Sequence, residues 1–158
     1  MLRYELLQNL HSIKGLDPVA DAFSRTVSSD VVNLVNFGSA LFVVYKGVGA
    51  TGTSTVTVEA CDDIVPTTTT AVPFFSKSST STDIQGAITS RAAAGFTTTA
   101  GSSQTYLIQV DAEELQNVGY SYVRLKAVEV VDSPVLGCIA IVLGNSRFGG
   151  SATATEID

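Results

Sequence analysis

Residues 53–61 read TSTVTVEAC and alternate strictly between polar and apolar side chains. One face of this stretch carries Val56, Val58 and Ala60, and the other carries Thr55, Thr57 and Glu59. A period of two residues is typical of a β-strand with one face in a core and one in solvent. Residues 122–131 (YVRLKAVEVV) repeat the pattern. Here Val123, Leu125 and Ala127 are expected to face inward, and Arg124, Lys126 and Glu129 to face mostly outward.

The neighbouring segments extend this pattern to the whole chain. Residues 40–45 (ALFVVY) and 135–143 (VLGCIAIVL) are continuous apolar runs, which indicate strands buried on both faces. Further strands are predicted at 31–35, 73–77, 96–99 and 105–111, with a weak edge strand at 84–91 and a loop at 66–71. The stretch AEELQN (112–117) fits one helical turn ended by Gly119. Because no helix is long enough for a parallel crossover, the eight or nine strands predict an all-β, antiparallel sandwich or barrel.

The first 25 residues differ from the rest. Leucines recur at helix-like spacing in residues 1–14, and Gly15 and the pair Asp17-Pro18 would end a helix there. We therefore expect an N-terminal arm or short helix with a lead-in over 1–25, a β-sandwich domain over 26–148 and a flexible C-terminal tail over 149–158.

Composition restricts the function. Charged residues make up 15% of the 158 residues and the net charge is −6, which disfavours nucleic acid and anionic membranes as partners. Thr (18), Ser (17) and Gly (13) are abundant, as in short strands and polar turns. No apolar run at the N-terminus has the length of a signal peptide, so synthesis and folding in a cytoplasm are expected.

The residues for common active sites are scarce. His11 is the only histidine and falls in the expected arm, so neither a Ser-His-Asp site nor a zinc site is expected. Cys61 and Cys138 are expected to be two buried, reduced thiols, and a disulfide would require their strands to face each other. One acidic set could converge into a calcium site or a glycosidase pair: Asp62, Asp63, Asp111, Glu113 and Glu114. Solvated turn residues explain these acids better, so we expect no enzyme, no cofactor and no metal.

Several phrases of the sequence resemble a known group of proteins. They are SSDVVN (28–33), KGVGATGTSTVTVEACDD (46–63), VDAEEL (110–115), Y-x-YVRLK (120–126) and VDSPV (131–135). Together they resemble the capsid decoration, or cement, proteins that stabilise the heads of tailed bacteriophages. The resemblance implies a jelly-roll sandwich that binds the major capsid protein on the outer capsid surface. It also implies dimers or trimers and assembly into the virion within the bacterial cytoplasm.

A weakly charged, Thr-rich sandwich with an apolar arm suits adhesion to another protein. We expect the contacts at loops 47–53 and 66–71 and at the arm residues Leu2, Tyr4, Leu6, Leu7 and Leu10. The arm leucines could instead fold back onto the core. Two other functions remain open: a receptor- or glycan-binding module of a head or tail fibre, which the lack of Trp disfavours, and a jelly-roll hydrolase.

Overall fold

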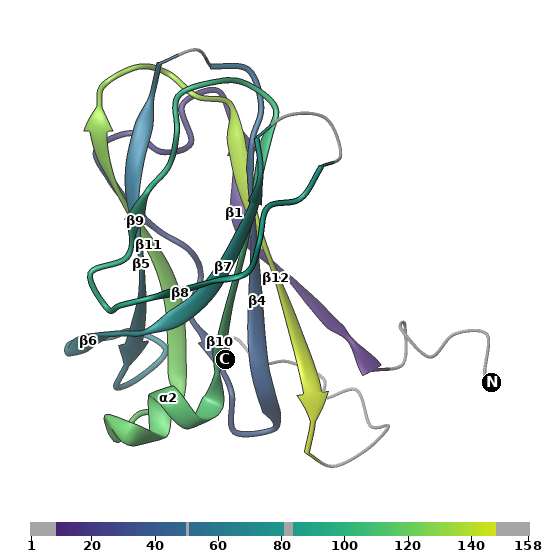
Figure 1. Cartoon of the computed structure of the whole chain (residues 1–158). Helices are drawn as coiled ribbons and strands as arrows, with labels where there is room; N and C mark the ends of the chain where they lie inside the picture. Colours follow the sequence, from purple (N-terminus) through teal and green to yellow (C-terminus); the bar gives the residue numbers. More distant parts are fainter. Residues whose placement is uncertain (1–8, 50, 81–83, 148–158) are drawn as a thin grey trace.

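The computed structural model describes residues 9–49, 51–80 and 84–147, which form two β-sheets packed face to face (Figure 1). The first sheet has the strand order β1-β12-β4-β10-β7-β8. Its strands are β1 (His11–Val19), β12 (Gly137–Ser146), β4 (Phe37–Lys46), β10 (Gln104–Asp111), β7 (Phe74–Ser79) and β8 (Thr89–Arg91). All of its pairings are antiparallel.

The second sheet has the order β2-β11-β5-β6, with β3 also paired to β11 and β9 also paired to β5. Its strands are β2 (Thr26–Ser28), β11 (Tyr122–Val131), β5 (Thr53–Cys61), β6 (Thr69–Val72), β3 (Val32–Asn33) and β9 (Phe96–Thr97). These pairings are antiparallel too, so the predicted all-β sandwich is confirmed.

The connections are those of a jelly roll. We count β1, β2, β4, β5, β6, β10, β11 and β12 as the first to the eighth strand. The first sheet then contains the order first-eighth-third-sixth, and the second contains second-seventh-fourth-fifth. Two Greek keys wound together in this way make an eight-stranded jelly roll, as expected. The remaining strands β7 and β8 continue the first sheet beyond β10.

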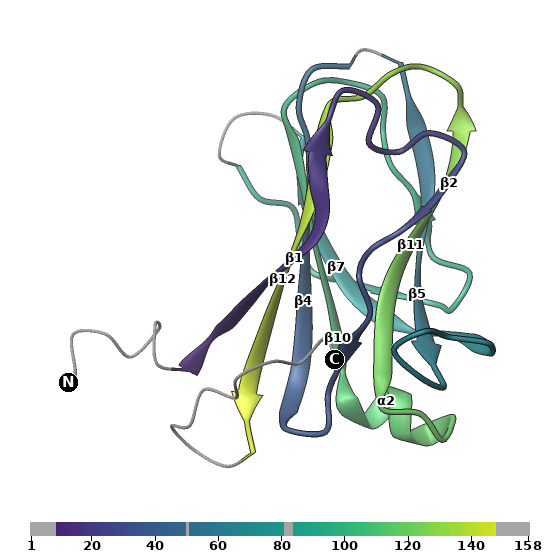
Figure 2. The same cartoon turned by 180° about the vertical axis from the view of Figure 1, so that it is seen from behind.

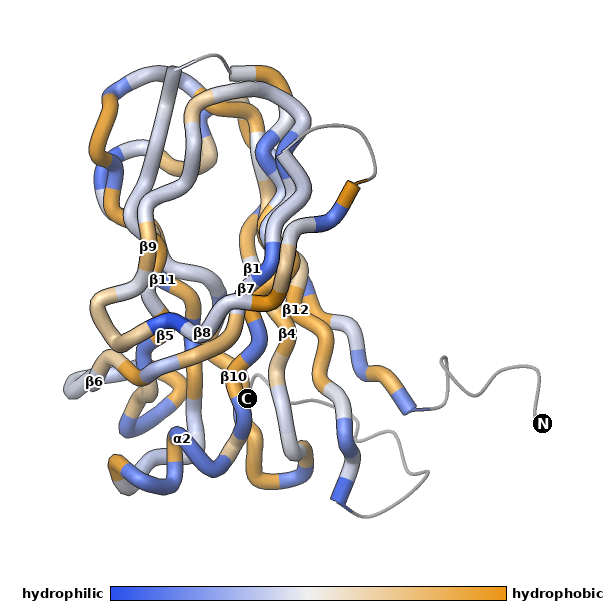
Figure 3. Tube along the Cα trace, in the orientation of Figure 1, coloured by the Kyte–Doolittle hydropathy of each residue, from blue (hydrophilic) through white to orange (hydrophobic). Residues whose placement is uncertain are grey.

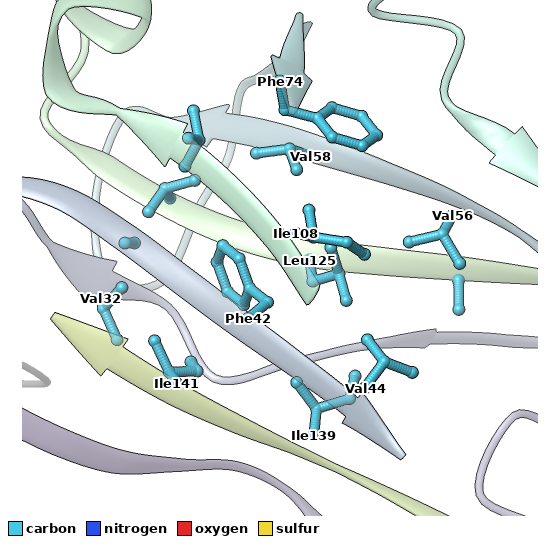
Figure 4. Packing of buried hydrophobic residues seen from close by; sticks show 14 of the residues in the cluster. Val32, Phe42, Val44, Val56, Val58, Phe74, Ile108, Leu125, Ile139 and Ile141 are labelled. Carbon is cyan, nitrogen blue, oxygen red and sulfur yellow. The ribbon is translucent and has the colours of Figure 1, made fainter. Parts of the chain in front are cut away.

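The core lies between the two sheets and consists of their inward-facing side chains (Figure 4). Phe42 of β4 is fully buried near its centre, with Ile108 and Ile141 from the neighbouring strands. Val58 and Leu125 approach from the second sheet and are also fully buried. The short helix α2 (Ala112–Asn117) closes one end, hereafter the helix end, and Gly119 follows it with φ +83, as the sequence predicts.

The predicted start of the sandwich at residue 26 is wrong. Residues 11–19, assigned to the arm and lead-in, form β1, which pairs with β12 at the edge of the first sheet (Figure 2). Gly15 and Pro18 do not prevent this because β1 is an edge strand whose register shifts between Lys14 and Leu16 and again before Val19. The predicted loop 66–71 is also partly wrong, because β6 begins at Thr69. The tail at 149–158 lies outside the described residues.

Candidate docking surfaces

The outer face of the first sheet is apolar over its central strands. It carries Leu41, Val43, Tyr45, Phe75, Leu107, Ala140 and Val142, which we call the apolar face. Antiparallel pairing aligns Ala140, Val43 and Leu107 in one row across three strands. Figure 3 shows hydrophobic residues along most of β4 and β12, since both faces of these strands are apolar. Burial on both faces, expected for 40–45, is not found: Tyr45 is 44% exposed.

The apolar face contains a hollow of about 280 Å³ between β4, β10 and β7. It is lined by Leu41, Phe75, Ser76, Lys77, Ile88, Leu107 and Gln109. Phe75 is 48% exposed and Ile88 is 73% exposed, which is unusual for side chains of this size. Apolar patches of this kind on a protein surface mark sites that bind another chain or a ligand.

One of the five predicted arm contacts falls within the described residues. Leu10 is 45% exposed, and its Cδ2 atom would lie 3.8 Å from a Cβ atom at Gly144 of β12. Gly144 alternates with the buried Leu143 and so faces outward, on the same side as Val142 of the apolar face. Leu10 therefore lies at the helix end of the outer side of the first sheet. Leu2, Tyr4, Leu6 and Leu7 lie outside the described residues.

The outer face of the second sheet is mostly polar, apart from Val128, and contains a three-residue ion cluster. Glu59 Oε2 accepts a hydrogen bond from Arg124 Nε at 2.9 Å and lies 2.7 Å from Arg124 Nη2. Glu59 Oε1 accepts a hydrogen bond from Lys126 Nζ at 3.0 Å. The Glu59 side chain is only 8% exposed, against 22% for Arg124 and 32% for Lys126. Sequence alternation placed all three outward correctly, but it missed that the cations cover the carboxylate.

Glu59 is ionised because of these partners. Burial of its carboxylate raises the pKa, but the hydrogen bonds from Lys126 and Arg124, together with their positive charges, outweigh burial and hold the pKa below its usual value. The cluster fixes β5 to β11, since Arg124 lies directly opposite Glu59 in the sheet. Around it, Thr55 and Thr57 complete a face that is well hydrated, in contrast to the apolar face.

Lys46 is a second ionisable group that sequence reasoning did not single out. It is 2% exposed, and Nζ donates to the carbonyl oxygens of Gly52 at 2.9 Å and Thr99 at 2.7 Å. Burial lowers the pKa of this lysine. These two hydrogen bonds join two loops at the end of the sandwich opposite the helix end. Lys46 therefore stabilises the fold, and its ammonium group is engaged by carbonyl oxygens of the chain itself.

Hydrogen bonds within the chain hold both of the loops that were expected to bind a partner. In the loop 47–53, Gly47 donates to the carbonyl oxygen of Leu136 at 2.6 Å and Gly52 is buried, whereas Thr51 is exposed and Val48 is 74% exposed. In the loop 66–71, the side chain of Thr67 donates to Asp62 at 2.6 Å. Whether these loops contact a partner stays a prediction.

Of the acidic residues considered for a metal or glycosidase site, Asp62 and Asp63 bond within a local turn, whereas Asp111, Glu113 and Glu114 lie at the start of α2. Asp62 accepts hydrogen bonds from Thr67 Oγ1 and from the backbone N–H groups of Thr67 and Thr68, and these lower its pKa. Within residues 9–49, 51–80 and 84–147, no three His, Cys, Asp or Glu side chains are grouped so as to hold a metal ion.

Cys61 is placed as expected, whereas Cys138 and His11 are not. Cys61 is buried and free, and burial raises the pKa of its thiol to about 11. Cys138 is also free but only partly buried, beside Tyr45 on the outer side of the first sheet. The two belong to different sheets and do not face each other. His11 is not in an unsupported arm: it begins β1, and its ring lies 6.0 Å from that of Phe37.

Comparison with known proteins gives only a weak structural likeness. Neither a protein-family model nor a curated protein matches this chain. Among solved structures, it is similar to the crystal structure of SPBc2 prophage-derived protein YomS, with a TM-score of 0.46 and 10% sequence identity over 85% of this chain and 92% of that one. A likeness at this level indicates no function. None of the helices in the described part of the chain has the length and apolar character needed to cross a membrane.

Proposed function

We propose that this chain is a structural protein of a tailed-phage virion that binds the outer surface of the icosahedral capsid and stabilises contacts between capsomers. The observation that carries the proposal is the difference between the two outer faces of the sandwich. The first sheet presents Leu41, Val43 and Leu107, whereas the second presents threonines and the Glu59 ion cluster. The sandwich therefore has one outer face whose apolar side chains favour contact with another protein and one whose polar side chains favour contact with water.

The proposed mechanism is adhesion without chemistry. Removing an apolar face from water is favourable by about 25 cal/mol per Å² of apolar surface. Each contact with the major capsid protein is modest, but a capsid repeats the same site many times, and a copy that bridges two capsomers gains from its second contact being intramolecular. The resemblance of several sequence phrases to decoration proteins supports the same role.

The test is co-sedimentation of the purified protein with capsids of the phage whose genome encodes it. We expect binding that saturates at a fixed number of copies per capsomer. Leu107→Glu places a charge in the apolar face and should abolish binding, whereas the control Thr57→Glu, on the opposite face, should keep it. Circular dichroism and thermal unfolding confirm that both variants are folded. Absence of binding by the wild-type chain, or equal binding by both variants, contradicts the proposal.

A further inference from the structure

The hollow in the apolar face has one charged side chain in its lining, and that side chain is a cation. Lys77 projects outward from β7 opposite Leu107 of β10, and both residues line the hollow. In the part of the chain that the structure describes, no carboxylate forms an ion pair with Lys77. A partly buried ammonium group among apolar side chains favours pairing with a carboxylate from another molecule.

A smaller hollow of about 60 Å³ lies next to the first, toward the helix end, and its charged side chains are acidic. It shares Phe75 and Gln109 with the first hollow and is also lined by Asp111 and Glu114. Asp111 alternates with the buried Val110, so it faces outward like Gln109, from which it accepts a hydrogen bond at 3.0 Å. We call the two hollows together the bipolar groove, since it has a cation at one end and two carboxylates at the other.

The strands fix the spacing between the two charged ends of the bipolar groove. Lys77 pairs with Leu107, and Asp111 lies four residues farther along β10. At a rise of about 3.4 Å per residue, the two ends are about 14 Å apart along the strands. Phe75 pairs with Gln109, halfway between them. An extended partner chain presents every second side chain on one face, so its positions i, i+2 and i+4 span the same distance.

The surroundings of the bipolar groove favour a protein as its occupant. The apolar face continues from the groove over β4 and β12, where it presents Leu41, Val43 and Val142. A small molecule in the groove would leave these side chains in water, whereas a protein surface would cover them together with the groove. The charged ends then fix the position of the partner along the strands, because a shifted partner would leave both charges unpaired.

We propose that the bipolar groove binds an extended segment of the capsid protein that carries an acidic, an apolar and a basic side chain at positions i, i+2 and i+4. The acidic side chain pairs with Lys77, and the basic side chain pairs with Asp111 and Glu114. The apolar side chain fills the larger hollow against Phe75 and Leu107. The segment has this pattern when read in one of its two directions, since the spacing is the same for both. This inference rests on the proposed function and names the chemistry that the capsid surface presents.

Carbodiimide cross-linking of the wild-type chain bound to capsids tests the inference. This reagent joins an amine to a carboxylate without a spacer, so it marks ion pairs in direct contact. The complex is cross-linked, digested and analysed by mass spectrometry. We expect Lys77 to be joined to an Asp or Glu of the major capsid protein. On one side of that acid, the capsid sequence should have an apolar residue two positions away and a Lys or Arg four positions away.

Two variants measure the contribution of the cation to capsid affinity. Lys77→Gln should weaken binding about fivefold and reduce its dependence on salt concentration. Lys14→Gln is the matched control, because Lys14 lies in the same row as Lys77 at the opposite edge of the sheet. Lys14 is already paired with Asp17 at 3.3 Å, so its loss should change the affinity less than about twofold. Thermal unfolding confirms that both variants are folded.

The outcomes separate this inference from the proposed function. If the wild-type chain binds capsids but Lys77→Gln binds equally well, the inference is wrong and the proposed function stands. The same holds if Lys77 gives no product with the capsid protein, or if the joined acid lacks the apolar and basic neighbours. If the wild-type chain does not bind capsids, both are wrong.

Discussion

Replacing Glu59 by Gln should destabilise the protein substantially at neutral pH. The glutamine keeps the size of the side chain but removes the charge that holds Arg124 and Lys126 on the outer face of the second sheet. It can still accept one hydrogen bond, but its amide group then points a donor at a neighbouring cation. The variant therefore tests the ion cluster without creating a cavity.

The size of the effect follows from exposure. A hydrogen bond to a charged group contributes about 1.5–3 kcal/mol, and Glu59 accepts two such bonds while only 8% exposed. Removing one member of a fully buried ion pair costs about 3–5 kcal/mol. Arg124 and Lys126 remain 22% and 32% exposed and recover part of their hydration, so the loss should be smaller. We expect the free energy of unfolding to fall by about 2–3 kcal/mol.

The pH dependence has a definite sign. The pKa of Glu59 is lower in the folded protein than its ordinary value of 4.5, so the folded state releases this proton more readily than the unfolded state. The stabilisation is therefore complete above pH 4.5 and is lost as the pH falls through the lowered pKa. The difference between wild type and Glu59→Gln should be constant near pH 7 and should shrink at acidic pH.

Urea unfolding followed by circular dichroism, repeated from pH 7 to pH 3, measures this difference. Glu113→Gln is the matched control because Glu113 is an exposed acid in the first turn of α2, and its loss should change stability by less than about 0.5 kcal/mol. If Glu59→Gln unfolds at the same urea concentration as wild type at pH 7, or if its deficit is the same at every pH, the cluster does not stabilise the sandwich as argued.

Three further predictions concern groups inside the fold. Lys46→Met should lower the free energy of unfolding by about 2 kcal/mol, because two carbonyl groups lose a charged donor. Since burial lowers the pKa of Lys46, the stability of the wild type relative to the variant should rise between the lowered pKa and 10.5 in urea titrations. Gly95→Ala should cost about 3 kcal/mol or more in thermal unfolding, because φ is +75 and a Cβ would overlap the carbonyl oxygen of Val56. A thiol reagent at pH 8 should modify one cysteine per folded chain, Cys138, and leave Cys61 until denaturant is added, because the Cys61 thiol is buried with its pKa raised to about 11; two fast-reacting thiols in the native protein would contradict its burial.

The strands that the sequence predicts correctly have strong side-chain patterns. Residues 53–61 and 122–131 alternate so regularly that β5 and β11 have the predicted bounds. β1 and β6 are missed because their signals are weak: Gly15 and Pro18 punctuate the first, and the second is a run of threonines that reads equally as a loop. Both lie at sheet edges, where one neighbouring strand suffices to fix the backbone.

The ion cluster can be predicted only once the pairing between strands β5 and β11 is known. Glu59 is 65 positions from Arg124 and 67 from Lys126, and alternation places each of the three outward without relating them. Once β5 is known to pair antiparallel with β11, Arg124 falls opposite Glu59, and the contact follows. The buried position of Lys46 has no such signal, because it depends on two loops that close over the end of β4.

The apolar runs at 40–45 and 135–143 contain more hydrophobic side chains than the core of the isolated sandwich buries. Continuous hydrophobicity is typical of a strand covered on both faces, and the core covers only the inner faces of β4 and β12. In an antiparallel sandwich with one solvated face, selection for stability alone would leave the outer positions polar, as on β5. Leu41, Val43 and Val142 instead remain apolar on the outer side. The excess argues that a second layer covers this face, and the proposed function identifies a source for it in the capsid surface.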